Sequence, residues 1–120
     1  MPTATTFDFE LLREAIEQAN ESSLVGFYAD DAEMQVIDKD RPPGSPLVLH
    51  GKSEIGELYR DICSRAMTHE VQDPVLTPDR VAFNEACRYP DGLRVLSANT
   101  LDLHGGKIVR HRLVQAWDEA

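Results

Sequence analysis

Apolar residues recur at two spacings along this chain, and each spacing predicts one kind of secondary structure. Near the start they follow three- and four-residue steps, which place them on one side of an amphipathic helix over residues 8–20. These apolar positions are Phe9, Leu12, Ile16 and Ala19. A second, short helix is expected to be capped by Ser22 or Ser23 and to end at Asp30 and Asp31. It would carry Leu24, Phe27 and Tyr28.

The middle of the chain combines a turn-rich segment with the clearest helical stripe. Residues 38–46 contain prolines and other turn formers, so we expect an exposed loop between short strands at 33–37 and 47–50. After this loop, Ser53 can cap a helix, and Glu54 suits the positive end of the helix dipole. The apolar stripe of that helix is Ile55, Leu58, Tyr59, Ile62 and Ala66.

From His69 onward the spacing changes to two, which is the period of a β-strand. Breaks at 77–79, 90–92 and 104–106 divide this part into four strands, and such short connections require antiparallel neighbours. The order of elements indicates the α+β class, with a curved antiparallel sheet and helices on one face that leave an apolar pocket. One domain is expected over residues 1–120, because a chain of this length normally builds one core.

Alternation along the strands predicts which side chains face the helices. In the last strand the face opposite the arginines is the inward one, since guanidinium groups favour water. Its members are Val109, His111, Leu113, Gln115 and Trp117. The preceding strand directs Val95, Ser97, Asn99, Leu101 and Leu103 inward. Earlier strands group Val81, Phe83, Glu85, Cys87 and Tyr89 on one face, and His69, Val71 and Asp73 on another. Glu85 therefore lies among apolar neighbours.

The acidic composition restricts the partners of the chain. It has 12 Lys and Arg against 21 Asp and Glu, a formal net charge of −9. Nucleic acids and anionic membranes attract clustered positive charge, so neither is an expected partner. No apolar run reaches the roughly 20 residues of a membrane span. Residues 1–6 lack the basic start of a leader peptide, so a cytoplasmic location is expected.

The cysteines and histidines predict neither a redox motif nor a metal centre. Cys63 and Cys87 fall in different elements without a CxxC spacing, so we expect reduced, buried thiols. No HxH or HExxH spacing places two metal ligands on one face. We therefore expect no metal and no cofactor.

Three segments resemble the SnoaL-like branch of the nuclear transport factor 2-like superfamily, which includes ketosteroid isomerases and polyketide cyclases. They are FYADDAEM at 27–34, HGKSEIGELY at 50–59 and HGGKIVRHRLVQAWD at 104–118. The resemblance covers nearly the whole chain. It implies a cystatin-like cone of curved sheet closed by helices, often dimeric through the outer sheet face. Members also include epoxide hydrolases, dehydratases and non-catalytic binders, so the fold alone does not choose an activity.

Position by position, the resemblance to ketosteroid isomerases is partial. Tyr28 and Tyr59 look like that family's supporting tyrosines, and Asn99 falls where its oxyanion-binding aspartic acid would be. Val36 stands where the catalytic base would sit, and residues 12–16 offer no oxyanion tyrosine. The polar residues of limonene epoxide hydrolases are not matched either, since Glu85 and Cys87 occupy the nearest inward positions.

The side chains on the inward faces of the strands predict a candidate site. Its catalytic residues would be His111, Glu85 and Asn99, from three consecutive strands. An apolar wall raises the pKa of a carboxyl group and lowers that of an imidazole, which suits proton transfer near neutrality. Asn99 could donate a hydrogen bond to a developing enolate oxygen. The ligand pocket would be lined by Tyr28, Tyr59, His69, Phe83, Cys87, Leu101, Leu113 and Trp117.

Two hypotheses for function follow. The first is a small cofactor-independent enzyme of the isomerase, cyclase or dehydratase type, with His111 or Glu85 as the base, acting on a small apolar carbonyl compound. The alternative is a non-catalytic module that binds a small hydrophobic ligand or dimerises, in which Glu85 pairs with His111 or an arginine in a buried polar network. In either case we expect a homodimer through the outer sheet face. That face carries Leu96, Ala98, Val114 and Ala116.

Overall fold

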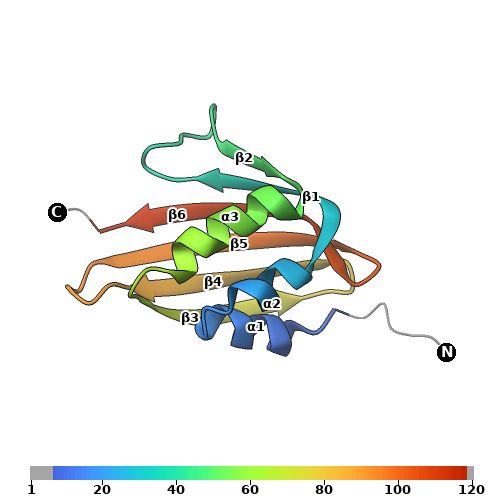
Figure 1. Ribbon diagram of the computed structural model, residues 1–120, viewed down its shortest axis with the longest axis horizontal. Helices are drawn as coiled ribbons and strands as arrows, with labels where there is room; N and C mark the ends of the chain where they lie inside the picture. Colours follow the sequence, from blue (N-terminus) through green and yellow to red (C-terminus); the bar gives the residue numbers. More distant parts are fainter. Residues whose placement is uncertain (1–6, 119–120) are drawn as a thin grey trace.

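The computed structural model describes residues 7–118, in which helices gather on one face of a six-stranded sheet (Figure 1). The elements are α1 (Phe9–Glu17), α2 (Glu21–Gly26), β1 (Tyr28–Ile37), β2 (Leu47–His50), α3 (Gly51–Cys63), β3 (Thr68–Leu76), β4 (Arg80–Arg88), β5 (Arg94–His104) and β6 (Lys107–Trp117). Residues 1–6, for which no leader peptide is predicted, lie outside the described residues, as do residues 119–120. No helix within 7–118 combines the length and apolar character needed to cross a bilayer.

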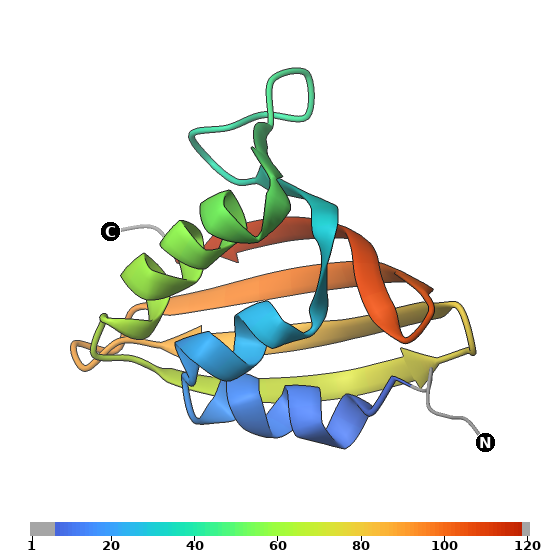
Figure 2. The same cartoon turned by 45° about the vertical axis from the view of Figure 1, so that its right-hand side comes forward.

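The sheet has the strand order β2-β1-β6-β5-β4-β3. The predicted antiparallel meander forms from β3 to β6, and the α+β class is confirmed. β1 joins β6 in parallel, so the complete sheet is mixed. The cause is the path of the chain: after β1 and β2, α3 crosses the sheet to its far edge, and the meander then returns to β1 (Figure 2).

The first two helices differ in their boundaries from the sequence prediction. Asp8 caps α1, and Asn20, rather than Ser22 or Ser23, caps α2 by accepting the Ser23 amide at 3.2 Å. Tyr28 starts β1 instead of belonging to α2. The strand begins this early because its first residues pair with β6, where the Ile108 amide donates to the carbonyl of Phe27 at 2.9 Å.

α3 starts at Gly51, two residues before the predicted cap. Gly51 has φ +79°, a left-handed conformation that glycine adopts without strain. His50, rather than Ser53, is the N-cap residue of the helix, and Glu54 Oε1 accepts the His50 amide at 2.7 Å. Ala66, predicted on the apolar stripe, lies beyond the helix and is exposed.

The core lies between the inner sheet face and the helices. α1 is anchored over β3 by a hydrogen bond from the Val71 amide to Glu17 Oε2 at 3.0 Å, and the Phe9 and Phe83 rings meet edge to face. A bulge in β6 makes one predicted side-chain orientation wrong. The register shifts beside Leu103, so Ile108 is fully buried and Val109, predicted inward, is half-buried.

Candidate functional site

A cavity of about 70 Å³ lies between the helices and the inner sheet face, which we call the central cavity. Its apolar lining includes Ile16, Leu24, Met34, Leu58, Ile62, Phe83 and Leu113. Pockets for drug-sized ligands are roughly 300–1,000 Å³. The central cavity therefore admits a few waters or a small fragment as it stands, and a larger ligand would have to widen it.

Most of the residues nominated from the sequence line the central cavity. They include all three proposed catalytic residues, Glu85, Asn99 and His111. The nominated pocket residues that line it are Tyr59, His69, Phe83, Cys87, Leu113 and Trp117. Tyr28 and Leu101 do not, because each is packed into the core with 1% of its surface exposed.

Four polar side chains form a continuous hydrogen-bonded series, here the Tyr–His–Asn chain. Tyr59 and Tyr28 join their hydroxyls at 2.6 Å, and the Tyr28 hydroxyl lies 2.8 Å from His111 Nδ1. His111 Nε2 lies 2.8 Å from Asn99 Oδ1. Because an amide oxygen only accepts, Nε2 carries the imidazole proton, Nδ1 accepts from Tyr28, and Tyr28 accepts from Tyr59. All the hydroxyl protons are thus directed along the chain.

Burial keeps the Tyr–His–Asn chain uncharged at neutral pH. It lowers the pKa of His111 to about 3 and raises the pKa of Tyr28 well above its usual value. Burial likewise raises the pKa of Tyr59. His111 is therefore neutral, and both of its ring nitrogens are already hydrogen-bonded. This geometry leaves no lone pair for a substrate proton, so it does not favour His111 as the base.

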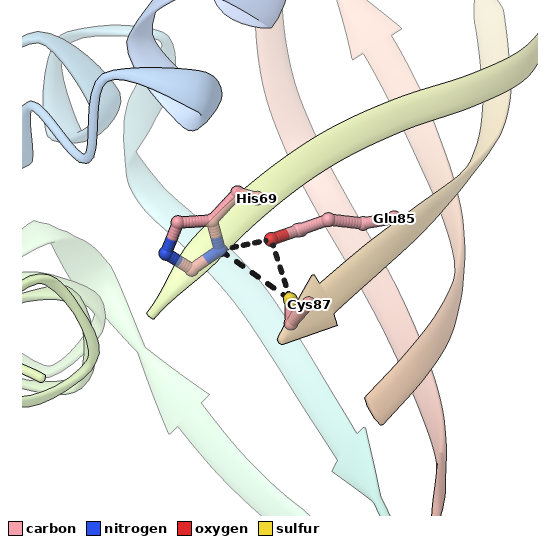
Figure 3. A group of neighbouring side chains, drawn as sticks. All are labelled: His69, Glu85 and Cys87. Carbon is pink, nitrogen blue, oxygen red and sulfur yellow. Dashed lines mark hydrogen bonds and ion pairs between the residues drawn. The ribbon is translucent and has the colours of Figure 1, made fainter. Parts of the chain in front are cut away.

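A second group, the His–Glu–Cys cluster, lies on β3 and β4 (Figure 3). Glu85 and Cys87 are two residues apart on one face of β4, and His69 stands directly opposite Cys87. Glu85 Oε2 lies 2.8 Å from His69 Nδ1 and 3.2 Å from Cys87 Sγ, and Sγ lies 3.3 Å from Nδ1. Glu85 thus pairs with His69, and not with His111 or an arginine as the buried-network alternative expected.

A β-bulge in β3 sets this pairing. The register shifts between Gln72 and Val75, and Asp73 adopts φ +54°. Asp73, predicted to share the face of His69, is exposed at the bulge. If the register of Val75 with Ala82 continued along β3 without a bulge, every pairing on the His69 side would move by one, and His69 would lie opposite Arg88 instead of Cys87.

The thiols are not activated as nucleophiles. Burial raises the pKa of Cys87, and the neighbouring Glu85 raises it further. Burial and the charge of Glu21 raise the pKa of Cys63. Both cysteines are free thiols, as predicted, although Cys63 is half-buried rather than buried.

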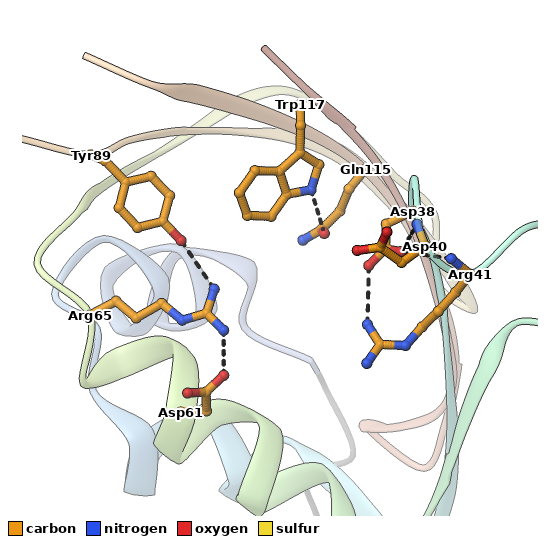
Figure 4. A network of polar contacts seen from close by, with 8 residues as sticks. All are labelled: Asp38, Asp40, Arg41, Asp61, Arg65, Tyr89, Gln115 and Trp117. Carbon is orange, nitrogen blue, oxygen red and sulfur yellow. Dashed lines mark hydrogen bonds and ion pairs between the residues drawn. The ribbon is translucent and has the colours of Figure 1, made fainter. Parts of the chain in front are cut away.

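Polar and aromatic side chains lie at the end of the central cavity nearest to residues 38–41 (Figure 4). Arg65 donates to the Tyr89 hydroxyl at 3.0 Å and also binds Asp61, while Trp117 Nε1 donates to Gln115 at 3.2 Å. Arg65, Gln115 and Trp117 also line a neighbouring surface depression that includes residues 38–41, so they form the wall between the two spaces.

The lining residues that were not nominated from the sequence include Cys63, Arg65 and Met67. Cys63 could have been found, because it follows Tyr59 by four residues on the same helix. Arg65 and Met67 lie in the connection between α3 and β3, where no periodicity predicts direction.

Many solved structures have the same arrangement of elements, but their sequences differ strongly from that of this chain. A nuclear transport factor 2-like protein of unknown function from Mesorhizobium loti superposes with a TM-score of 0.78 and 14% identity, over 90% of this chain and 87% of that one. A candidate ketosteroid isomerase from Kribbella flavida gives 0.73 and 12%, over 93% and 76%. A de novo designed protein with a curved β-sheet gives 0.73 and 14%, over 90% and 84%.

Sequence comparison adds no closer relative, since no family model and no curated protein matches the chain. Identities this low establish the fold and leave the activity open. The SnoaL-like branch, suggested by the sequence motifs, remains a prediction. The structural matches show that the chain has the fold of the nuclear transport factor 2-like superfamily.

Proposed function

We propose that this protein is a small cofactor-independent enzyme that moves a proton on an apolar carbonyl compound, in a reaction of the isomerase, cyclase or dehydratase type. The main observation in support of this proposal is the position of Glu85 in the wall of the central cavity, where one carboxylate oxygen is hydrogen-bonded and the other is available. Oε2 accepts from His69 and Cys87, and within residues 7–118 Oε1 has no hydrogen-bond partner. A carboxylate placed in this way can take a proton from a bound carbon acid.

Asn99 is the proposed partner of Glu85. Its Oδ1 is taken by His111, and its Nδ2 makes only a long contact of 3.5 Å to the Ser97 carbonyl. The amide N–H groups are therefore available to stabilise the oxygen of an enolate as negative charge develops there. His111 acts as a positioning residue, since its Nε2–H fixes the orientation of the Asn99 amide.

The lining supports an apolar substrate. Aliphatic and aromatic side chains make up most of the cavity wall, and the polar groups are concentrated on β4, β5 and β6. The fold match to a candidate ketosteroid isomerase is consistent with this class of chemistry. The small volume favours a compact substrate, or one whose binding separates α3 from the sheet.

A thermal-shift screen of steroids, aromatic ketones, polyketide fragments and phenolates tests the proposal. A ligand at 100 times its Kd stabilises the wild type by about 2.7 kcal/mol, which raises Tm by roughly 10 °C. We expect His111→Gln, which removes the hydrogen bond that orients the Asn99 amide, to weaken a carbonyl ligand by roughly tenfold, the value of one lost hydrogen bond, and Glu85→Gln to leave its binding nearly unchanged. Glu57→Gln, an exposed change on α3 away from the cavity, is the matched control. No ligand for the wild type, with both cavity variants merely less stable, would favour a structural role.

The alternative is a non-catalytic module that binds a small hydrophobic ligand or dimerises. One observation favours it: Val36, where the resemblance places the isomerase base, is a core residue with 4% exposure. In that case the Tyr–His–Asn chain would only satisfy buried polar groups, which it does completely within residues 7–118.

We also propose a homodimer through the outer sheet face. Leu96 and Val114 are exposed by 49% and 42% on this face, and the strand register places them beside Ala116 and Ala98. We expect light scattering at tens of micromolar protein to give the mass of two chains, and the double change Leu96→Asp with Val114→Asp to give one. Leu11→Asp, which alters an exposed leucine on α1, should leave the dimer intact. A monomeric wild type would contradict this prediction.

A further inference from the structure

The His–Glu–Cys cluster combines three different metal-binding atoms at one point. His69 Nδ1, Glu85 and Cys87 Sγ lie within 4.8 Å of one another, and within residues 7–118 this is the one group of three such residues. Sequence motifs did not predict a metal site because only Glu85 and Cys87 share a strand, and the third ligand, His69, comes from a different strand. Imidazole, carboxylate and thiolate are the ligands that Zn²⁺ takes in proteins. We propose that His69, Glu85 and Cys87 bind a zinc-like divalent transition-metal ion.

The geometry of the cluster fits a tetrahedral ion. Bond lengths of about 2.3 Å to sulfur and about 2.0–2.2 Å to nitrogen and oxygen place tetrahedral ligands roughly 3.3–3.6 Å apart. The three observed separations are 2.8, 3.2 and 3.3 Å. Each ligand pair therefore has to open by only about 0.3–0.6 Å to admit the ion. Figure 3 shows the three side chains directed toward one another.

The charges of the cluster also suit the ion. Glu85 and a Cys87 thiolate contribute two negative charges, which balance Zn²⁺, and His69 binds as the neutral imidazole. Binding releases the thiol proton to solvent and moves the His69 proton from Nδ1 to Nε2. The side chains of His69 and Glu85 are only 4% and 19% exposed, so an electrically neutral complex avoids most of the cost of burying charge.

The backbone holds the ligands in place before any ion arrives. His69 and Cys87 are direct partners in the β3–β4 ladder, and Glu85 follows the same face of β4. All three residues line the central cavity, so a fourth coordination position directed into it would be open to water or a small ligand. Three protein ligands with an open position are typical of zinc sites that bind exchangeable molecules.

This inference does not rest on the proposed function. A bound ion would occupy the carboxylate of Glu85, so the metal-loaded protein and the proton-transferring protein are alternative states of one cavity. Metal binding is measured by spectroscopy without any substrate, and its failure would leave the acid–base proposal untouched.

Titration of the untagged chain with Co²⁺ tests the site. The wild type should bind one Co²⁺ per chain, with the near-ultraviolet thiolate-to-cobalt band and the intense visible bands of a four-coordinate ion, and Zn²⁺ should abolish both. Cys87→Ser should lose the thiolate band, and His69→Gln should weaken binding by at least about 100-fold, since loss of even a supporting residue costs 10–100-fold. Cys63→Ser, the matched change at the other thiol, should retain the spectrum.

Two results would overturn the proposal. One is a wild type that shows no stoichiometric thiolate-to-cobalt band, a result that does not depend on any variant being folded. The other is a band that persists in Cys87→Ser and disappears in Cys63→Ser. Because Cys87 is buried, the folding of Cys87→Ser should be checked by circular dichroism. If this variant does not fold, His69→Gln provides the second test.

Discussion

We expect Glu85→Gln to slow proton exchange at the α-carbon of a bound ketone by about 100-fold or more, the usual contribution of a general base. The amide of glutamine has nearly the same shape and its oxygen can still accept from His69 and Cys87, but it cannot take up a proton at neutral pH. The measurement is deuterium incorporation followed by NMR, with a ketone that stabilises the wild type. The loss should appear in kcat rather than KM, because the carboxylate acts on the reacting proton.

Glu57→Gln makes the same chemical change on the exposed face of α3 and should leave the exchange rate unchanged. An exchange rate for Glu85→Gln equal to that of the wild type would remove Glu85 from the mechanism. Equal loss in both variants would point to the global charge or stability of the protein instead.

The second large effect is a loss of stability in acid caused by His111. Its pKa is about 3 in the folded protein because burial disfavours the imidazolium, whereas an unfolded histidine titrates near 6.5. Between these pH values the unfolded state binds a proton that the folded state cannot, so stability falls as the pH falls. The loss is about 1.4 kcal/mol per pH unit, begins near pH 6.5 and stops near pH 3.

Urea unfolding at pH 7.5 and 4.5 measures this effect. The wild type should lose about 2–3 kcal/mol more than His111→Gln over this interval. The comparison isolates His111, because acid protonation of the carboxylates affects both proteins alike. Equal pH dependence of the two proteins would show that His111 becomes protonated in the folded state, and would contradict the closed Tyr–His–Asn chain.

Much of the architecture was predictable because side-chain periodicity is a local property. The two-residue period from His69 onward predicts β3 to β6, and it correctly turns Asn99, His111 and Glu85 to the inner face. The three-to-four-residue stripes likewise locate α1 and α3. Short turns between the strands then leave antiparallel pairing as the physical solution.

The contacts within the site depended on tertiary structure. Alternation places Glu85 on the inner face but does not say which residue of a neighbouring strand stands opposite, and the bulge at Asp73 decides that it is His69 that reaches it. Tyr28 reaches His111 because β1 pairs in parallel with β6, a long-range contact that no turn between them dictates.

The sequence by itself thus determined most of the elements, most of their inner-face positions and many of the residues that surround the cavity, because these follow from the spacing of apolar side chains. The tertiary structure decided the strand register, the partners of Glu85 and His111, and the convergence of three metal-binding atoms. Those features arise from pairing between distant segments, where one extra residue in a strand moves every side chain to a new neighbour.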